Sequence, residues 1–342
     1  MTDSLPVDHP AVKKPKIGVL LLNLGTPDAT DYWSMRRYLS EFLSDKRVID
    51  YPAWFWQPLL QGIILSVRPS KSGAAYRKIW NMERNESPLK TYTRAQCEKI
   101  EALMRADYPE LEFCWGMRYG NPSIKAGIEA LIERGCTKIL FFALYPQYSA
   151  CTTATAYDKA FEVLGTLNRQ PASRTADAWH DDPAYIEILA QSVRDTLSTA
   201  PSQPDHIVTS FHGLPKRYLM NGDPYHCYCA KTSRLLREAL GWPQERWTTT
   251  FQSRFGPEEW LQPYTDETVM DLAKKGVKHL AIISPAFVSE CVETLEEVDL
   301  ELREEFLDNG GERFTYIPCL NDSAPHINFL AERIKRELQG WL

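Results

Sequence analysis

Long apolar runs, an excess of positive charge and a secretory leader are all missing from this sequence of 342 residues. No run approaches the ~18 apolar residues of a membrane-spanning helix. The net charge of −6 gives no general attraction to nucleic acid. Residues 1–6 lack the basic and then apolar pattern of a secretory signal. We therefore expect a cytoplasmic globular protein with reduced cysteines that binds no nucleic acid.

A dinucleotide fingerprint is also missing. The first predicted strand is followed by Asn-Leu-Gly-Thr-Pro at residues 23–27, not by G-x-G-x-x-G, which argues against a nucleotide-dependent dehydrogenase. A two-domain binding protein for a small solute is a second alternative, but such a protein normally carries an export signal.

Short apolar runs alternate with helical patterns along the chain. This alternation predicts an α/β fold with parallel sheets flanked by helices, and the chain length favours two domains. The predicted strands are 16–24, 111–117, 138–144, 206–210, 247–252, 279–283 and 313–317. The predicted helices are 93–106, 123–134, 183–199, 231–240, 258–275, 292–307 and a closing helix from residue 325.

A weak internal repeat divides the chain into two similar Rossmann-like domains. Gly25 and Gly120 are 95 residues apart, whereas the matching Gly213 and Gly256 are 43 apart, so the first half carries about 52 extra residues. We predict a first domain at 14–178, with an insert at about 44–94, joined by the C-terminal helix 325–342. The second domain is predicted at 179–324, with the active cleft between the two domains.

The most apolar stretch, from Trp54 to Leu65, has two interpretations. It is either a core helix or an exposed lip that covers a flat ligand or rests on a membrane surface, because large aromatics are costly to leave in water.

A histidine and a run of glutamates each follow a predicted strand. His212 follows strand 206–210, and Glu290, Glu293 and Glu297 follow strand 279–283. Ligands bind at the carboxyl ends of parallel strands, so these groups are expected to face one cleft. A neutral imidazole accepts protons or binds a metal, and carboxylates bind hard cations. On pattern alone, the alternatives are a structural histidine and a solvated acidic helix face that continues to Glu301 and Glu304.

Five motifs, in this order, resemble the signatures of the ferrochelatase family. They are Leu-Asn-Leu-Gly-Thr-Pro at 22–27, Tyr-Pro-Gln-Tyr-Ser at 145–149, Phe-His-Gly-Leu-Pro at 211–215, Thr-Phe-Gln-Ser-Arg-Phe-Gly at 250–256 and Glu-Thr-Leu-Glu-Glu at 293–297. The resemblance runs from about residue 16 to the C-terminus and is close to the proteobacterial branch. It implies a lyase that inserts Fe(II) into protoporphyrin IX, forms protohaem and releases two protons in the last step of haem biosynthesis.

The resemblance also implies roles for individual residues. His212 and Glu293 would be catalytic, and both would contact the metal together with Glu290 and Glu297. The porphyrin would be bound by Arg68, Tyr76, Ser87, Arg118 and Tyr119, with Trp260 as an aromatic wall. The family often has Asp-His where this chain has Glu290 and Cys291, so no ligand role carries over to position 291.

The expected partners are the porphyrin and Fe(II), which is a substrate, so no resident cofactor is required. Some members hold a [2Fe–2S] cluster through cysteines in a C-terminal extension. This chain ends without them, and the spacing of Cys151, Cys227, Cys229 and Cys291 matches no cluster motif, so we expect no cluster. We expect a monomer, with peripheral membrane contact through the lip as an option. A cobalt or nickel chelatase of the same superfamily is the nearest alternative, because metal choice is poorly encoded in sequence.

Overall fold

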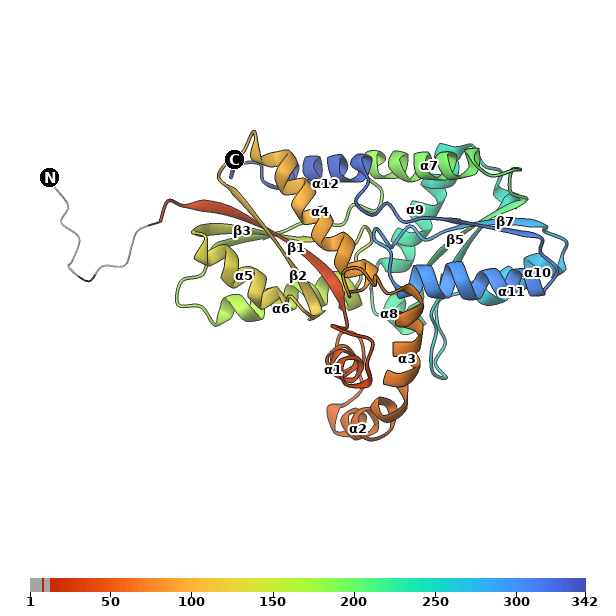
Figure 1. Cartoon of the computed structure of the whole chain (residues 1–342), viewed down its shortest axis with the longest axis horizontal. Coiled ribbons are helices and arrows are strands. Elements are labelled where there is room, and N and C mark those ends of the chain that lie inside the picture. Colours follow the sequence, from red (N-terminus) through yellow and green to blue (C-terminus); the bar gives the residue numbers. More distant parts are fainter. Residues whose placement is uncertain (1–7, 9–12) are drawn as a thin grey trace.

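In the computed structural model, which describes residues 8 and 13–342, two four-stranded parallel sheets share one strand order (Figure 1). The first sheet runs β2-β1-β3-β4 and the second runs β6-β5-β7-β8, so β5 takes the place of β1. The strands are β1 (Lys16–Thr26), β2 (Leu111–Gly120), β3 (Cys136–Ala143), β4 (Ala172–Thr175), β5 (His206–His212), β6 (Trp247–Gln252), β7 (His279–Ile283) and β8 (Arg313–Ile317). The predicted fold class of two similar Rossmann-like domains is confirmed.

Apolar side chains on alternate faces of β1 place helices on both sides of the first sheet. Val19 and Leu21 pack into a core with α4 (Pro88–Arg105) and α12 (Ala324–Glu337). Leu20 and Leu22 point the other way, toward α5 (Ile124–Glu133) and α6 (Thr155–Gly165). Parallel sheets are covered on both faces, which is why these strands are nearly continuous apolar runs.

The second sheet is built in the same way. Ile207 and Ala281 face α7 (Pro183–Ser198) and α9 (Tyr225–Leu240). The opposite face carries Val208 and Ile282 and packs on three segments. These are α10 (Thr265–Lys274), the π-helix η4 (Glu293–Leu302) and α11 (Arg303–Asp308). Two short helices complete this half: α8 (Lys216–Met220) and the 3₁₀ turn η3 (Gln244–Arg246).

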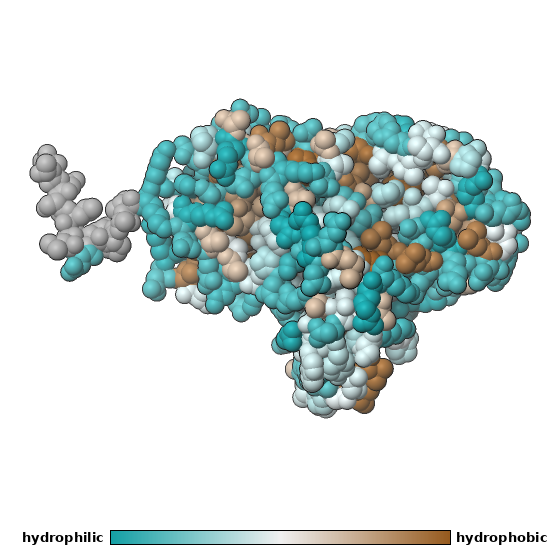
Figure 2. All heavy atoms as spheres, viewed as in Figure 1, coloured by the Kyte–Doolittle hydropathy of each residue, from teal (hydrophilic) through white to brown (hydrophobic). Residues whose placement is uncertain are grey.

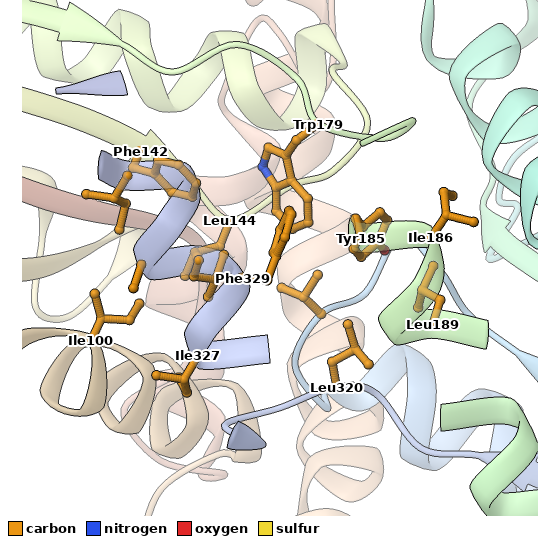
Figure 3. Close-up of a cluster of buried hydrophobic side chains, with 14 of the residues drawn as sticks. Ile100, Phe142, Leu144, Trp179, Tyr185, Ile186, Leu189, Leu320, Ile327 and Phe329 are labelled. Carbon is orange, nitrogen blue, oxygen red and sulfur yellow. The ribbon is translucent and has the colours of Figure 1, made fainter. Parts of the chain in front are cut away.

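One hydrophobic core runs through both halves (Figure 3). Trp179, which lies between the two sheets in sequence, meets the ring of Tyr185 edge-on at 4.8 Å and that of Phe329 at 5.3 Å. Phe329 comes from α12, which packs beside both α4 and α7 (Figure 1). The closing helix therefore contacts helices of both halves.

A helical lobe is inserted between β1 and α4 (Figure 1). It consists of α1 (Tyr32–Leu43), α2 (Ala53–Leu59), the π-helix η1 (Leu60–Ile64) and α3 (Leu65–Ile79). A further π-helix of the first half, η2 (Ala150–Ala154), lies outside the lobe, between β3 and α6. Trp56 and Leu60 are buried in the lobe, but Trp54 is 80% exposed and Ile63 is 63% exposed. Figure 2 shows apolar surface at the lower end of the lobe. The stretch thus has one face in the core of the lobe and one face exposed, and a ligand or membrane contact of the exposed face stays a prediction.

The structure differs from the prediction in several segments. The predicted helix 258–275 starts only at Thr265, because residues 253–264 form a loop with prolines at 257 and 263. Strand β4 was not predicted, since Ala-Ser-Arg-Thr has no apolar run. The lobe helices α1 and α3 and helix α6 were also not assigned. Within the described residues, no helix has the length and apolarity that a bilayer crossing needs.

Candidate functional site

Two glycines mark equivalent strand ends in the two halves. A Cβ on Gly25, which has φ +119°, would lie 1.8 Å from the carbonyl oxygen of Tyr119 on β2. A Cβ on Gly213 would lie 2.7 Å from the carbonyl oxygen of Gln252 on β6. As each loop leaves the sheet, its glycine therefore lies directly against the backbone of the neighbouring strand, and a side chain there would collide with that backbone. His212 directly precedes Gly213, at the carboxyl end of β5, one of the two inner strands of its sheet.

His212 is the last residue of β5 and is half-buried. Its Nδ1 lies 2.6 Å from the carbonyl oxygen of Gly213. A carbonyl only accepts, so in the neutral imidazole Nδ1 carries the proton and Nε2 keeps its lone pair. Trp260 packs on the same loop, with a ring carbon 3.2 Å from the position of a Cβ on Gly213. The imidazole thus has one nitrogen available to accept a proton or bind a metal, next to an aromatic wall.

Glu293 is the first residue of η4 and is connected to His212 through Gln252. Gln252 pairs with His212 across β5 and β6. Its Nε2 donates to the carbonyl oxygen of Glu293 at 2.8 Å, and its Oε1 accepts from Ser210 at 2.6 Å. Sequence reasoning did not single out Gln252, although the Phe-Gln-Ser-Arg-Phe-Gly motif contains it.

Two buried tyrosines of the lobe lie near the Glu293 carboxylate. Burial, reinforced by the charge of Glu293, raises the pKa of Tyr76 well above its ordinary value. Burial, then Tyr76 and Glu293, raises the pKa of Tyr38 in the same way. Tyr76, a predicted porphyrin contact, is therefore brought close to the predicted catalytic glutamate from the other half. Tyr38 was not predicted, and no sequence motif marks it.

Glu297 lies one turn further along η4. Ser253, which adopts a left-handed φ of +64°, donates to its carboxylate. Burial raises the pKa of Glu297 to about 7, with the Glu293 charge adding to the effect and the Ser253 hydrogen bond opposing it. A carboxyl group with such a pKa exchanges protons near neutral pH.

Glu290 lies before η4, so the predicted stripe of glutamates does not start on the helix. Its buried carboxylate accepts from the Cys319 backbone N at 2.9 Å, the Tyr316 hydroxyl at 2.8 Å and the Thr294 hydroxyl at 2.5 Å. At the far end of the stripe, Glu301 and Glu304 are exposed. In the part of the chain that the structure describes, no three His, Cys, Asp or Glu side chains converge as a metal cluster. The four predicted metal contacts therefore do not form a closed cage.

Arg68 approaches the His212 side from the lobe. Its guanidinium lies 5.4 Å from the ring of Phe255, and that ring lies 4.9 Å from the ring of Trp260. Burial lowers the pKa of Arg68, and none of the ion pairs among residues 13–342 includes it. A half-buried arginine without a carboxylate partner is suited to bind a carboxylate of a ligand. The lobe is held against η4 nearby by the ion pair between Lys78 and Glu296 at 2.7 Å.

The other predicted porphyrin contacts have protein partners. Ser87 is buried and caps α4, where its Oγ accepts from the Lys90 backbone N at 3.3 Å. Arg118 donates to Thr155 Oγ1 at 2.7 Å and pairs with Asp45, which also accepts from the Tyr119 hydroxyl at 2.8 Å.

Arg118 also borders a cavity of about 690 Å³. The cavity is lined by residues of α1 and α6 among others, and neither His212 nor Glu293 is among the residues that line it. The structure thus brings His212, Glu293, Tyr76, Arg68 and Trp260 toward one boundary between the lobe and the second sheet. Arg118 lies apart from them, paired with Asp45, whereas Tyr119 packs in the same hydrophobic cluster of the lobe as Tyr76 and reaches Asp45 only through its hydroxyl.

Comparisons with known proteins agree on one family. The family model described as Ferrochelatase matches residues 16–338. The chain is 59% identical over 339 residues to the ferrochelatase of Agrobacterium fabrum, covering 99% of this chain and 98% of the relative. It is 57% identical over 341 residues to that of Rhodobacter capsulatus, covering 98% and 97%.

Similar solved structures include two proteins that share the fold at low sequence identity. SirB from Bacillus subtilis, solved with Fe³⁺, has a TM-score of 0.56 at 13% identity and covers 94% of this chain and 95% of its own. CbiX, described as the terminal enzyme of sirohaem biosynthesis in denitrifying bacteria, has a TM-score of 0.50 at 12% identity, covering 95% and 100%. By the match of its sequence over nearly its whole length, the chain belongs to the ferrochelatase family.

Proposed function

We propose that this chain inserts Fe(II) into protoporphyrin IX, forming protohaem and releasing two protons, as the terminal step of haem biosynthesis. The family match over residues 16–338 carries this proposal. Family membership makes the chain a lyase that inserts a metal ion into a tetrapyrrole. Fe(II) is then a substrate of the reaction, not a resident cofactor. We further propose that neither a cofactor nor a [2Fe–2S] cluster is needed.

In this proposal His212 accepts the pyrrole protons. A free-base porphyrin carries two N–H protons inside a flat ring, and both must leave as iron binds the four nitrogens. The free Nε2 of His212 has the lone pair for this step, and Nδ1 stays bonded to the Gly213 carbonyl. Trp260 provides a rigid wall that helps hold the ring in a strained shape, which uses binding energy to expose the nitrogen lone pairs.

Glu293 is proposed to contact the iron and to act with His212 in catalysis. Carboxylate oxygens are hard ligands that bind Fe(II) and release it again. Glu297, whose pKa burial raises to about 7, is proposed to take protons onward or to contact the metal before insertion. For Glu290, predicted as a further metal contact, three protein donors already fill the carboxylate, and its role is considered separately below.

The two propionates of the porphyrin are proposed to meet the lobe. Arg68 supplies a half-buried guanidinium without a carboxylate partner among the described residues, and Tyr76 lies near Glu293. Ser87, Arg118 and Tyr119 remain proposed contacts, although each now bonds to protein groups that the ligand would have to displace or share.

The domain bounds are proposed as predicted: 14–178 with an insert at about 44–94, 179–324, and the helix 325–342 returning to the first domain. Helix α12 packs on α7 of the second domain but also on α4 of the first, and its contact with α4 supports the last assignment. We also propose a cytoplasmic monomer that touches the membrane peripherally through the lip, from Trp54 to Leu65. The exposure of Trp54, Phe55 and Ile63 supports this contact, because such surfaces are costly to keep in water.

An anaerobic assay tests the proposed activity. Purified protein is mixed with Fe(II) and protoporphyrin, and the loss of porphyrin fluorescence is followed together with the haem absorbance. We expect haem at a rate that depends on enzyme concentration. Parallel reactions with Co(II) and Ni(II) test the alternative metals. The proposal would be contradicted if haem formed no faster with the enzyme than without it while cobalt or nickel was inserted instead.

A further inference from the structure

A buried glutamine of α4 connects the first half to the segment that leads into η4. Gln96 is fully buried, and its Nε2 donates to Ser289 Oγ at 2.9 Å and to the Asn321 carbonyl oxygen at 2.8 Å. An amide nitrogen has two hydrogens, so both are used. Its Oε1 has no hydrogen-bond partner, which is a cost in a buried site. The side chain therefore holds α4 to Ser289 and Asn321 through its two donated hydrogen bonds alone.

Asn321 joins this glutamine to Glu290. Its φ of +50° is a left-handed conformation that asparagine tolerates better than most residues. Its carbonyl oxygen also accepts from His326 Nδ1 at 2.7 Å, and its Oδ1 accepts from the Glu290 backbone N at 2.9 Å. The Asn321 backbone N donates to the Val288 carbonyl oxygen at 2.8 Å. The residue thus fixes both ends of the segment 288–290 from one position.

The Glu290 carboxylate continues the network into the first turn of η4. One oxygen accepts from the Cys319 backbone N and the other from the hydroxyls of Tyr316 and Thr294. Thr294 in turn accepts from the Cys291 backbone N at 2.9 Å. Thr294 follows Glu293 directly, so the network ends one residue from the proposed catalytic glutamate.

We propose that Gln96, Asn321 and Glu290 form a buried strut that positions Glu293 relative to the first half of the molecule. Glu290 then acts through its hydrogen bonds and not as a metal ligand, because a metal would have to displace three protein donors. This inference rests on the proposed role of Glu293. A misplacement of about 1 Å at a reacting group can cost about 10²-fold in rate, so the strut acts on catalysis without touching the substrate.

A double-mutant cycle tests the strut. Gln96→Leu, Glu290→Gln and the double variant are compared by anaerobic Fe(II) insertion, with kcat and the KM for Fe(II) measured separately. We expect each single variant to lose about 10- to 100-fold in kcat with KM for Fe(II) within about 2-fold. The double variant should be no slower than the slower single one, since both changes break one network.

Two control variants separate the strut from its surroundings. Lys99→Gln removes the Lys99–Asp322 ion pair, which joins the same elements at the surface, and Glu301→Gln removes an exposed glutamate of η4. Both should keep kcat within about 2-fold, as expected for exposed pairs and charges. If Gln96→Leu does not fold, Ser289→Ala removes one acceptor of Gln96 with little lost volume. A kcat loss of about 3- to 10-fold at unchanged KM is then expected, and wild-type kcat would contradict the strut.

Two outcomes of the cycle overturn the proposal. If the losses in kcat multiply, the two residues act independently. If Glu290→Gln raises the KM for Fe(II) tenfold or more while Gln96→Leu leaves it unchanged, Glu290 is a metal contact. The variant Glu293→Gln distinguishes failure of the strut from failure of the proposed role of Glu293. If Glu293 has no catalytic role, this variant keeps wild-type kcat. If only the strut is wrong, the variant is still impaired.

Discussion

The side chain of Gln252 donates a 2.8 Å hydrogen bond to the carbonyl oxygen of Glu293. Gln252 is also the strand partner of His212, so one residue links the strand end that carries His212 to the start of η4, where Glu293 lies. The spacing between the imidazole and the first turn of η4 is therefore set by a buried amide and not by either motif alone.

Replacing Gln252 with leucine should loosen this link. The Glu293 carbonyl and the Ser210 hydroxyl would each lose a buried partner, and each such loss costs about 1–3 kcal/mol. We expect the free energy of unfolding to fall by that order in urea titrations and kcat to fall about tenfold. Gln244→Leu, at an exposed position, is the matched control. Full activity in Gln252→Leu would show that the link does not position Glu293.

Glu297 should make stability depend on pH below neutrality. Its pKa is about 7 in the folded protein and 4.5 ordinarily, so the folded state binds the extra proton between those values. That contribution is present below pH 4.5 and is lost as the pH rises through 7. As the pH rises from 4.5 to 7, the free energy of unfolding of the metal-free wild type should therefore fall relative to that of Glu297→Gln. Urea unfolding at a series of pH values measures both. Parallel pH profiles for the two proteins would rule out the raised pKa.

His326 should act in the opposite direction. Burial lowers its pKa to about 4 from 6.5, so the unfolded chain takes up a proton that the folded protein does not. Stability from this group is present above pH 6.5 and is lost as the pH falls toward 4. The difference between 6.5 and about 4 corresponds to about 3 kcal/mol in the free energy of unfolding, because one pKa unit corresponds to about 1.4 kcal/mol. His326→Gln should flatten the acid side of the stability profile, and an unchanged slope would contradict the assignment.

Arg68 should matter for porphyrins with free propionates. Arg68→Leu is expected to raise the KM for protoporphyrin about tenfold, because a charge-assisted hydrogen bond contributes about 1.5–3 kcal/mol. The dimethyl ester of protoporphyrin should show little difference between variant and wild type. Arg84→Leu, outside the site, serves as the control. Equal sensitivity for acid and ester would place Arg68 away from the propionates.

Buried parallel strands were the part of the fold most accessible to sequence reasoning. Strands β6, β7 and β8 begin and end where they were predicted. Strand β7 is a short run of buried residues, and the edge strands β6 and β8 are rich in the β-branched and aromatic residues that favour strands. Strand β4 was missed because Ala172–Thr175 is only four residues long and has mostly exposed side chains, without the aromatic residues of the other edge strands. Helix α3 was left unassigned because Pro69 and Gly73 interrupt its periodic pattern, whereas α1 was missed although it contains neither residue type.

Of the candidate site, only the residues that lie in recognisable sequence motifs could be predicted. His212 and Glu293 stand out in sequence because each follows a strand. The roles of Gln252 and Gln96 depend on partners 41 and 225 residues away, respectively, which no local pattern encodes. The π-helical form of residues 293–302 was not predicted either, since a spacing of three and four residues indicates an α-helix first.

The most direct test of the account compares Glu293→Gln with Glu304→Gln. Glu304 is exposed on the same helical segment, so it controls for charge. Anaerobic Fe(II) insertion gives kcat, and quenching of protein fluorescence gives the Kd for protoporphyrin. The account predicts that Glu293→Gln loses at least about 10²-fold in kcat with Kd within about 2-fold, while Glu304→Gln matches the wild type. Weakened porphyrin binding with kcat preserved in Glu293→Gln would contradict it.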